Sequence, residues 1–200
     1  ARAYGIPETR VETNGPADER ALAERAAAGD ADARRVLLQW VLPTLRSATR
    51  AVLGPGADAE DATQQAAIDV LRGLSSFRGE ASLKGWCRTI GVRAALRLSR
   101  GRRPMAAVEP DQLQAAAESG SRLADSIPGE IRAHLDAIPP LQREAILLRH
   151  GMGYTMPEMA ALLDTSVNTI KSRLLKGRKA LRARIRQQSL VAEARAKGVS

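Results

Sequence analysis

The last third of the chain places amides, hydroxyls and cations at helical spacing, a combination suited to contacting nucleic acid. A predicted helix over residues 166–179 directs Val167, Ile170 and Leu174 into a core. Its other face carries polar residues first and basic residues later: Ser166, Asn168, Thr169, Lys171, Ser172, Arg173, Lys176, Arg178 and Lys179. Amides and hydroxyls can hydrogen-bond base edges, whereas cations can meet phosphates or guanine. We therefore expect this helix to read a DNA groove.

The residues before this helix are expected to hold it as the second element of a helix-turn-helix. Thr155 followed by Glu158 is typical of a capping box, which begins a short helix over residues 156–163. A three-residue turn starting at Asp164 then leads into the basic helix, so the two helices must cross steeply. Ala160 is small enough for that crossing. Asp164 stands at a turn position that often holds glycine, because the backbone there is left-handed.

A second basic zone lies in the middle of the chain. Residues 82–103 contain seven Lys or Arg and no acid. On a predicted helix over residues 81–99, one apolar face comprises Leu83, Cys87, Ile90, Ala94 and Leu98. At about 100° per residue, Trp86, Arg93, Arg97 and Arg100 form a neighbouring stripe. A polyanion is the expected partner of both basic zones.

Composition excludes several classes of function. One cysteine rules out an internal disulfide, and two histidines with no other sulfur ligand argue against a structural zinc site, so we expect no metal and no cofactor. No Ser/His/Asp or Cys/His grouping and no glycine-rich phosphate loop is visible, so an enzyme is not expected. No apolar stretch approaches the length of a membrane span, and a cytoplasmic protein that does not enter a membrane is expected.

The pattern predicts an all-α protein with two small helical domains joined by a flexible linker, the second containing the helix-turn-helix. The expected divisions are a disordered tail at 1–18, a first domain at 19–103, a linker at 104–126, a second domain at 127–186 and a tail at 187–200. One helix is expected from Asp18 to Val52, with a bend at Pro43. The next is expected to start with Asp58 as its cap.

Both domains resemble conserved regions of bacterial sigma factors. Pro139-Pro140-Leu141-Gln142-Arg143-Glu144, Leu147-Leu148-Arg149, Glu158-Met159-Ala160, Ser166-Val167, Thr169-Ile170-Lys171-Ser172-Arg173-Leu174 and Arg178-Lys179-Ala180-Leu181 resemble the fourth region. Ala59-Glu60-Asp61, Gln64, Leu74, Phe77-Arg78-Gly79, Trp86 and Ile90 resemble the second region. The two resemblances occur in the family's order over about residues 20–186. This two-region layout is similar to that of extracytoplasmic-function (ECF) sigma factors.

The resemblance implies a subunit that joins core RNA polymerase and recognises promoter DNA. Asp61, Gln64 and Gln65 would meet the β′ coiled coil, and the outer surface of the second domain would hold the β flap. The −10 element would be contacted by a set that combines two aromatics with cations: Phe77, Lys84, Trp86, Arg88, Arg93, Arg97 and Arg100. The helix at 166–179 would read the −35 element. The family also makes an anti-sigma factor a candidate partner.

The main alternative is a helix-turn-helix regulator that binds an operator and never joins polymerase. That alternative explains the second domain but not residues 58–103. A helical enzyme and an RNA-binding adaptor are weaker alternatives, the latter because aromatic residues are scarce. Since Phe77 and Trp86 are the only aromatics near the second basic zone, little surface is available for stacking unpaired bases. We therefore expect weak promoter melting that depends on both promoter elements.

Overall fold

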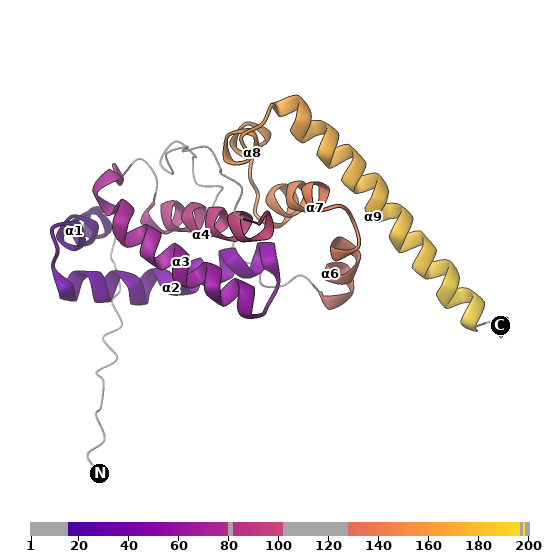
Figure 1. The fold of residues 1–200 in the computed structure, drawn as a ribbon, viewed down its shortest axis with the longest axis horizontal. Coiled ribbons are helices and arrows are strands. Elements are labelled where there is room, and N and C mark those ends of the chain that lie inside the picture. Colours follow the sequence, from indigo (N-terminus) through magenta and orange to yellow (C-terminus); the bar gives the residue numbers. More distant parts are fainter. Residues whose placement is uncertain (1–15, 80–81, 102–127, 197, 199–200) are drawn as a thin grey trace, which may run out of the picture.

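The computed structural model describes residues 16–79, 82–101, 128–196 and 198, and this part of the chain is helical with no strand. Figure 1 shows a block of helices from the first half joined to a second group, from which one long helix projects. The all-α prediction is confirmed. Residues 104–126, which are predicted to be a linker, lie outside the described residues.

The first half consists of α1 (Pro16–Ala27), α2 (Ala31–Leu53), α3 (Ala57–Gly73), the short 3-10 turn η1 (Leu74–Ser76) and α4 (Leu83–Ser99). The prediction of one helix from Asp18 to Val52 is wrong. Gly29 adopts a φ of 98°, which interrupts the helix, and the Asp30 carboxylate caps α2 by accepting from the Ala33 amide at 3.0 Å. Pro43 lies inside α2 without ending it.

The start of α3 also differs from the prediction, because Asp58 is not its cap. Gly56 occupies the N-cap position and makes no side-chain capping bond. Gly54 and Gly56 both have positive φ, at 82° and 146°, so the chain reverses over a backbone that other residues would strain to adopt. Asp58 lies instead in the first turn, where its negative charge is favourable beside the positive end of the helix dipole.

Helices α1 to α4 enclose a core whose largest fully buried side chains are Leu37, Leu45, Leu83 and Trp86. The expected position of Trp86 on an accessible stripe is wrong. Its indole lies 5.4 Å from the Phe77 ring between centroids, and a Cβ on Gly73 would approach it to 3.3 Å. The indole therefore packs between α3, α4 and the Phe77 loop.

The second half consists of α6 (Gly129–Asp136), α7 (Pro140–Ile146), η4 (Leu147–Gly151), α8 (Met156–Leu162) and α9 (Val167–Ala196). The predicted helix over 141–150 ends in the wider π-type turn of η4, in which the Met152 amide donates to the Leu147 carbonyl at 3.0 Å. Helix α9 continues to Ala196, where a tail from residue 187 was predicted.

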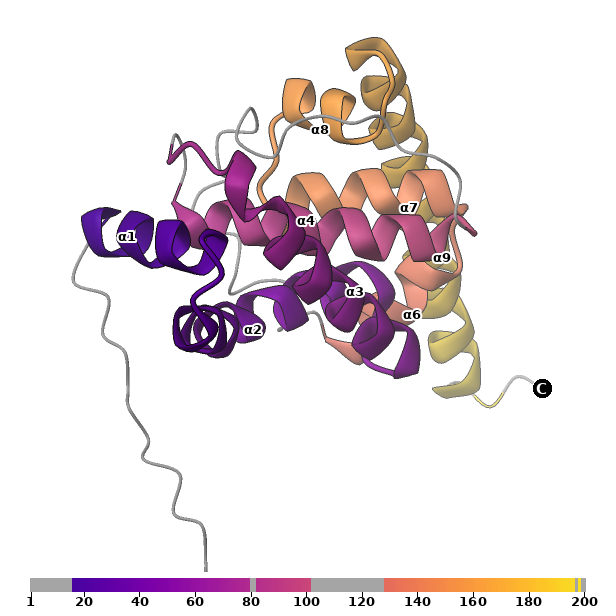
Figure 2. The ribbon, with the colours of Figure 1, turned by 60° about the vertical axis from the view of Figure 1, so that its left-hand side comes forward.

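The two predicted domains pack against each other through a shared hydrophobic core, a contact that the sequence did not indicate. Val92 and Leu96 of α4 lie in one buried cluster with Leu148 and Tyr154 of the second half. In Figure 2, α7 lies alongside α4. The Arg132 guanidinium of α6 also donates to the Arg50 and Ala51 carbonyls, at 3.3 and 3.2 Å, in the last turn of α2, where carbonyls lack partners in the next turn of helix.

Candidate nucleic-acid and polymerase interfaces

The capping box that begins α8 is present as predicted. The Thr155 hydroxyl accepts from the Glu158 amide at 3.4 Å, and the Glu158 carboxylate accepts from the Thr155 amide at 2.7 Å. These two reciprocal bonds satisfy backbone donors that a helix start otherwise leaves to water. They fix the direction in which α8 enters the helix-turn-helix.

The turn between α8 and α9 has the left-handed residue that the sequence indicated. Asp164 has a φ of 47°, and the Ser166 hydroxyl then caps α9 by accepting from the Thr169 amide at 3.1 Å. Met159 of α8 and Ile170 of α9 are completely buried, so the two helices are held by a common core. The turn and the core together set which face of α9 points outward.

The outward face of α9 carries most of the residues expected to bind the −35 element. Those whose side chains are exposed are Ser166, Asn168, Lys171, Ser172, Lys176, Arg178 and Lys179. Thr169 is half-buried and its hydroxyl lies 2.9 Å from that of Ser166. Amide and hydroxyl groups therefore stand at the start of the helix, and cations follow along the same exposed side.

Arg173 departs from this arrangement. Its side chain is half-buried, and its Nη1 atom is buried with no hydrogen-bond partner among the described residues. Burial, followed by the positive charge of Arg100, lowers the pKa of Arg173, while Glu144 opposes the shift. Part of the guanidinium therefore faces the junction with α4 and α7, and the expectation that it projects outward is wrong for this arrangement of the two halves.

Most cations of the second basic zone, on α4, are buried or half-buried. Lys84 is exposed and its ammonium lies 4.6 Å from the centre of the Trp40 ring, a cation–π contact. Arg88 has only 7% of its surface exposed, and Arg93, Arg97 and Arg100 are half-buried. The expected open face for the −10 element is therefore not open here.

Carboxylates of two other helices pair with Arg97 and Arg100. Arg97 pairs with Asp69 of α3, and Arg100 pairs with Glu144 of α7. Phe77, the remaining residue of the expected −10 set, is half-buried beside Trp86. Partners of this kind compete with phosphates, so DNA can engage these cations only after the pairs are exchanged.

The residues expected to meet polymerase lie together on the outer face of α3. Asp61, Gln64 and Gln65 are all exposed, and the Gln65 amide donates to Asp69 at 2.9 Å. Among them they present one carboxylate and two amides within five residues of helix. This polar surface is available to a partner in the structure as it stands.

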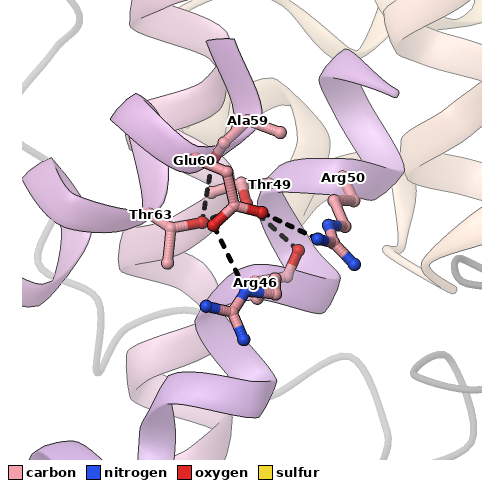
Figure 3. A network of polar contacts seen from close by, with 6 residues as sticks. All are labelled: Arg46, Thr49, Arg50, Ala59, Glu60 and Thr63. Carbon is pink, nitrogen blue, oxygen red and sulfur yellow. Dashed lines mark hydrogen bonds and ion pairs between the residues drawn. The ribbon is translucent and has the colours of Figure 1, made fainter. Parts of the chain in front are cut away.

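A polar network fixes α3 against α2 beside that surface (Figure 3). The Glu60 carboxylate accepts from Arg50 at 2.7 Å and from Arg46 at 3.3 Å, and the Arg50 hydrogen bond is the main reason that the pKa of Glu60 is lowered. Beneath it, the buried hydroxyls of Thr49 and Thr63 lie 2.7 Å apart. The network holds the turns of α3 on which Asp61 and its neighbours stand.

Gly177 and Glu144 are two structurally important residues that the sequence analysis did not select. A Cβ on Gly177 would lie 2.9 Å from Ile146 Cδ1 and 3.2 Å from the Gln142 carbonyl oxygen, so α7 and α9 approach each other closely there. A glycine inside an otherwise strong helix pattern was the available signal. Glu144 gave no signal, because its burial depends on how the two halves pack.

Comparison with known proteins assigns both halves. The model "Sigma-70 region 2" matches residues 37–104, and the model "Sigma-70, region 4" matches residues 129–181. The ECF RNA polymerase sigma-E factor of Escherichia coli strain K12 is 30% identical over 177 residues, which cover 82% of this chain and 92% of that protein. The chain belongs to the ECF family of RNA polymerase sigma factors. It is therefore a subunit that joins core polymerase and directs promoter-specific transcription initiation.

Other relatives of this sigma factor agree. The ECF sigma factor EcfG of Rhodopseudomonas palustris strain TIE-1 is 30% identical over 150 residues, covering 71% of this chain and 79% of that protein. The structure of CnrH in complex with the cytosolic domain of CnrY matches with a TM-score of 0.52 at 26% identity, over 84% of this chain and 97% of that one. RpoE of Bartonella quintana, in complex with the anti-sigma factor NepR, also gives 0.52, at 25% identity over 74% and 94%.

Two searches of the described residues bear on other classes of site. Among them, no group of three or more His, Cys, Asp or Glu is placed to hold a metal ion. None of the described helices of the sigma factor is both long and apolar enough to cross a membrane.

Proposed function

We propose that the exposed face of α9 reads the −35 element of this sigma factor's promoters. The proposal rests on the order of side chains along α9, in which amide and hydroxyl groups come first and cations follow. The Ser166 cap and the Asp164 turn fix the orientation of this helix. Asn168 and Ser172 stand where base edges would be met, and Lys176 and Lys179 follow where phosphates would be met. The bases are then read near the start of α9 and the backbone is held further along.

The α3 surface of Asp61, Gln64 and Gln65 supplies the contact with the β′ coiled coil of polymerase, and the outer surface of the second half supplies the contact with the β flap. These three α3 side chains are exposed, and the Glu60 network fixes the helix that bears them. Residues 104–126 connect the two halves and would thread through the polymerase cleft. The α3 contact needs no rearrangement of the first half.

Contact with the −10 element requires the second half to move away from α4. Arg88 is buried and Arg100 is paired with Glu144 of α7, so neither can reach a phosphate in this arrangement. We infer that separation of the halves accompanies entry into the polymerase. Since Trp86 is in the core and Phe77 packs on it, few aromatic faces remain to stack opened bases.

An anti-sigma factor is a further proposed partner. Two structures that resemble this one are complexes, one of CnrH with the cytosolic domain of CnrY and one of RpoE with the anti-sigma factor NepR. A small protein that binds the two halves in their packed arrangement would keep α4 covered. We propose that the chain works in the cytoplasm with polymerase, as a binding subunit and not as an enzyme.

Run-off transcription with purified core polymerase tests this function. The reconstituted enzyme should initiate from a promoter that has both elements and give little transcript when either is scrambled. Co-migration with core polymerase on a sizing column separates a sigma factor from an operator-binding regulator. Efficient initiation without a −35 element would contradict the proposed role of α9, and failure to join core polymerase would favour the regulator.

A further inference from the structure

Helix α9 extends beyond the residues that match the region 4 model. The match ends at residue 181, whereas α9 continues to Ala196. Every residue from 182 to 191 is exposed. From residue 167 to residue 191 the helix contains no acid, and residues 182–191 add three cations, Arg182, Arg184 and Arg186.

Two of the three added cations share a face with the residues proposed to read bases. At about 100° per residue, Asn168, Arg182 and Arg186 project within about 40° of one another around the helix axis. The buried residues Ile170 and Leu174 project to the far side. Arg184 lies about 160° from Arg186 and so projects away from this face.

Arg182 and Arg186 also share one surface with two cations from earlier turns of the helix. Leu175, Arg178, Lys179, Arg182, Ala183 and Arg186 border a single shallow depression. Its four cations have no acid among them to offset their charge. The surface therefore suits a ligand with repeated negative charges along a line, as a nucleic-acid backbone has.

The length of the face decides where those cations fall on DNA. Residues 168 and 186 are 18 positions apart, which is about 27 Å of α-helix. The major groove is only about 12 Å wide, so a helix that reads bases with its first turns extends past the edge of the groove. Its later turns then pass over the phosphates that flank the element.

We propose that Arg182 and Arg186 form a second, sequence-independent binding site for the phosphate backbone of duplex DNA beside the −35 element. The inference rests on the proposed function of α9 and adds to it. Each contact releases counterions from the duplex, so the site strengthens promoter binding most at low salt. The base-reading residues determine sequence specificity. The added arginines raise the affinity for any duplex that α9 enters, whatever its sequence.

The test compares Arg182→Gln and Arg186→Gln with Arg184→Gln, a matched control that removes the same charge from an exposed position on the other side of the same helix. Holoenzyme with each variant is bound to a promoter duplex and to the same duplex with a scrambled −35 element, over a range of salt concentrations. Circular dichroism confirms that α9 is retained.

The proposal predicts that Arg182→Gln and Arg186→Gln each reduce the slope of log affinity against log salt by about 0.9, on both duplexes. As the salt concentration rises from 50 to 200 mM, the factor by which each variant binds DNA more weakly than wild type should fall about threefold. Arg184→Gln should leave the slope unchanged. Equal slopes for all three variants, or a loss confined to the intact −35 duplex, would overturn it. Failure of wild-type holoenzyme to initiate would instead reject the proposed function itself.

Discussion

The guanidinium of Arg100, at the end of α4, forms an ion pair with the carboxylate of Glu144 on α7, and this pair joins the two halves of the chain. Both carboxylate oxygens take part, with Nε of Arg100 at 3.2 and 3.1 Å from them. Glu144 is 2% exposed and the Arg100 side chain 17%. Arg173 of α9 lies close enough that both charges shift its pKa. One carboxylate therefore compensates two arginines from different halves.

Replacement of that carboxylate is expected to destabilise the packed arrangement. Glu144→Gln leaves Arg100 and Arg173 without a countercharge in a largely buried place, and breaking such a pair costs about 3–5 kcal/mol. We expect the free energy of unfolding, measured by urea titration, to fall by about 3 kcal/mol, the lower end, because Arg100 keeps some contact with water. Asp136→Asn removes the exposed pair with Arg143, and this control should cost less than about 1 kcal/mol. Equal losses in the two variants would contradict the assignment.

Gly177 is expected to be required for packing, although helix propensity alone favours alanine there. Gly177→Ala should gain about 1 kcal/mol in propensity, yet its Cβ would meet Ile146 and the backbone of Gln142. Overpacking of this kind typically costs about 1–3 kcal/mol, so a net loss is expected in thermal or urea unfolding. Gly151→Ala, where an added Cβ meets nothing within 4 Å, serves as the control. A stabilised Gly177→Ala protein would show that α7 and α9 can separate without cost.

Local features of the fold could be predicted from the sequence because each depends on a few neighbouring residues. The Thr155 and Glu158 box, the Ser166 cap and the left-handed backbone at Asp164 all arise within three or four positions of chain. The inward residues of α9 follow from a period of about 3.6. These features were sufficient to place the helix-turn-helix and its exposed face.

Features that depend on how the halves meet could not be predicted. The stripe that contains Trp86 and Arg93 was identified as one face of α4, but periodicity does not say which neighbour covers a face. Helix α4 contributes to two different hydrophobic cores, since Cys87 lies in one and Leu96 in the other. A helix that is buried on two sides has little amphipathic contrast, so its cations give a misleading impression of an open surface.

The turn at Asp164 offers a test of backbone strain. Its φ of 47° is one that asparagine, aspartate and glycine tolerate better than β-branched residues. Asp164→Val should therefore lower the free energy of unfolding by about 1–2 kcal/mol, whereas Asp164→Gly should change it little. Urea unfolding of both variants measures the difference. If valine were tolerated as well as glycine, the turn would have to adopt another conformation.

Cys87 should be unreactive until the first half opens. It is completely buried in the core between α2 and α4, and this burial raises the pKa of its thiol far above the ordinary range. Because the thiolate is the reactive form, alkylation by iodoacetamide at pH 8 should be far slower than for a free cysteine. Labelling in denaturant, followed by mass spectrometry, gives the control rate for the same thiol. Rapid labelling of the native protein would show that the core opens readily.

The two kinds of contact on α9 should separate in binding experiments. Asn168→Ala removes an exposed amide near the start of the helix, and loss of a base contact should cost about 1–3 kcal/mol on a cognate −35 element and alter the preferred sequence. Lys179→Ala removes an exposed cation further along, so binding should weaken by a similar factor on every duplex and the salt slope should fall by about 0.9. Fluorescence anisotropy of holoenzyme on cognate and single-base-substituted duplexes measures both effects.

The ratio of the affinities for cognate and base-substituted duplexes shows whether a residue contacts a base or the backbone. For Asn168→Ala, the ratio of cognate to substituted affinity should approach one at the base that the amide reads and stay unchanged at the others. For Lys179→Ala, the ratio should stay at the wild-type value at every base while both affinities fall. If Lys179→Ala changed this ratio, the Lys179 ammonium would contact a guanine base instead of a phosphate. The turns of α9 that read bases would then extend further toward the C-terminal end of the helix.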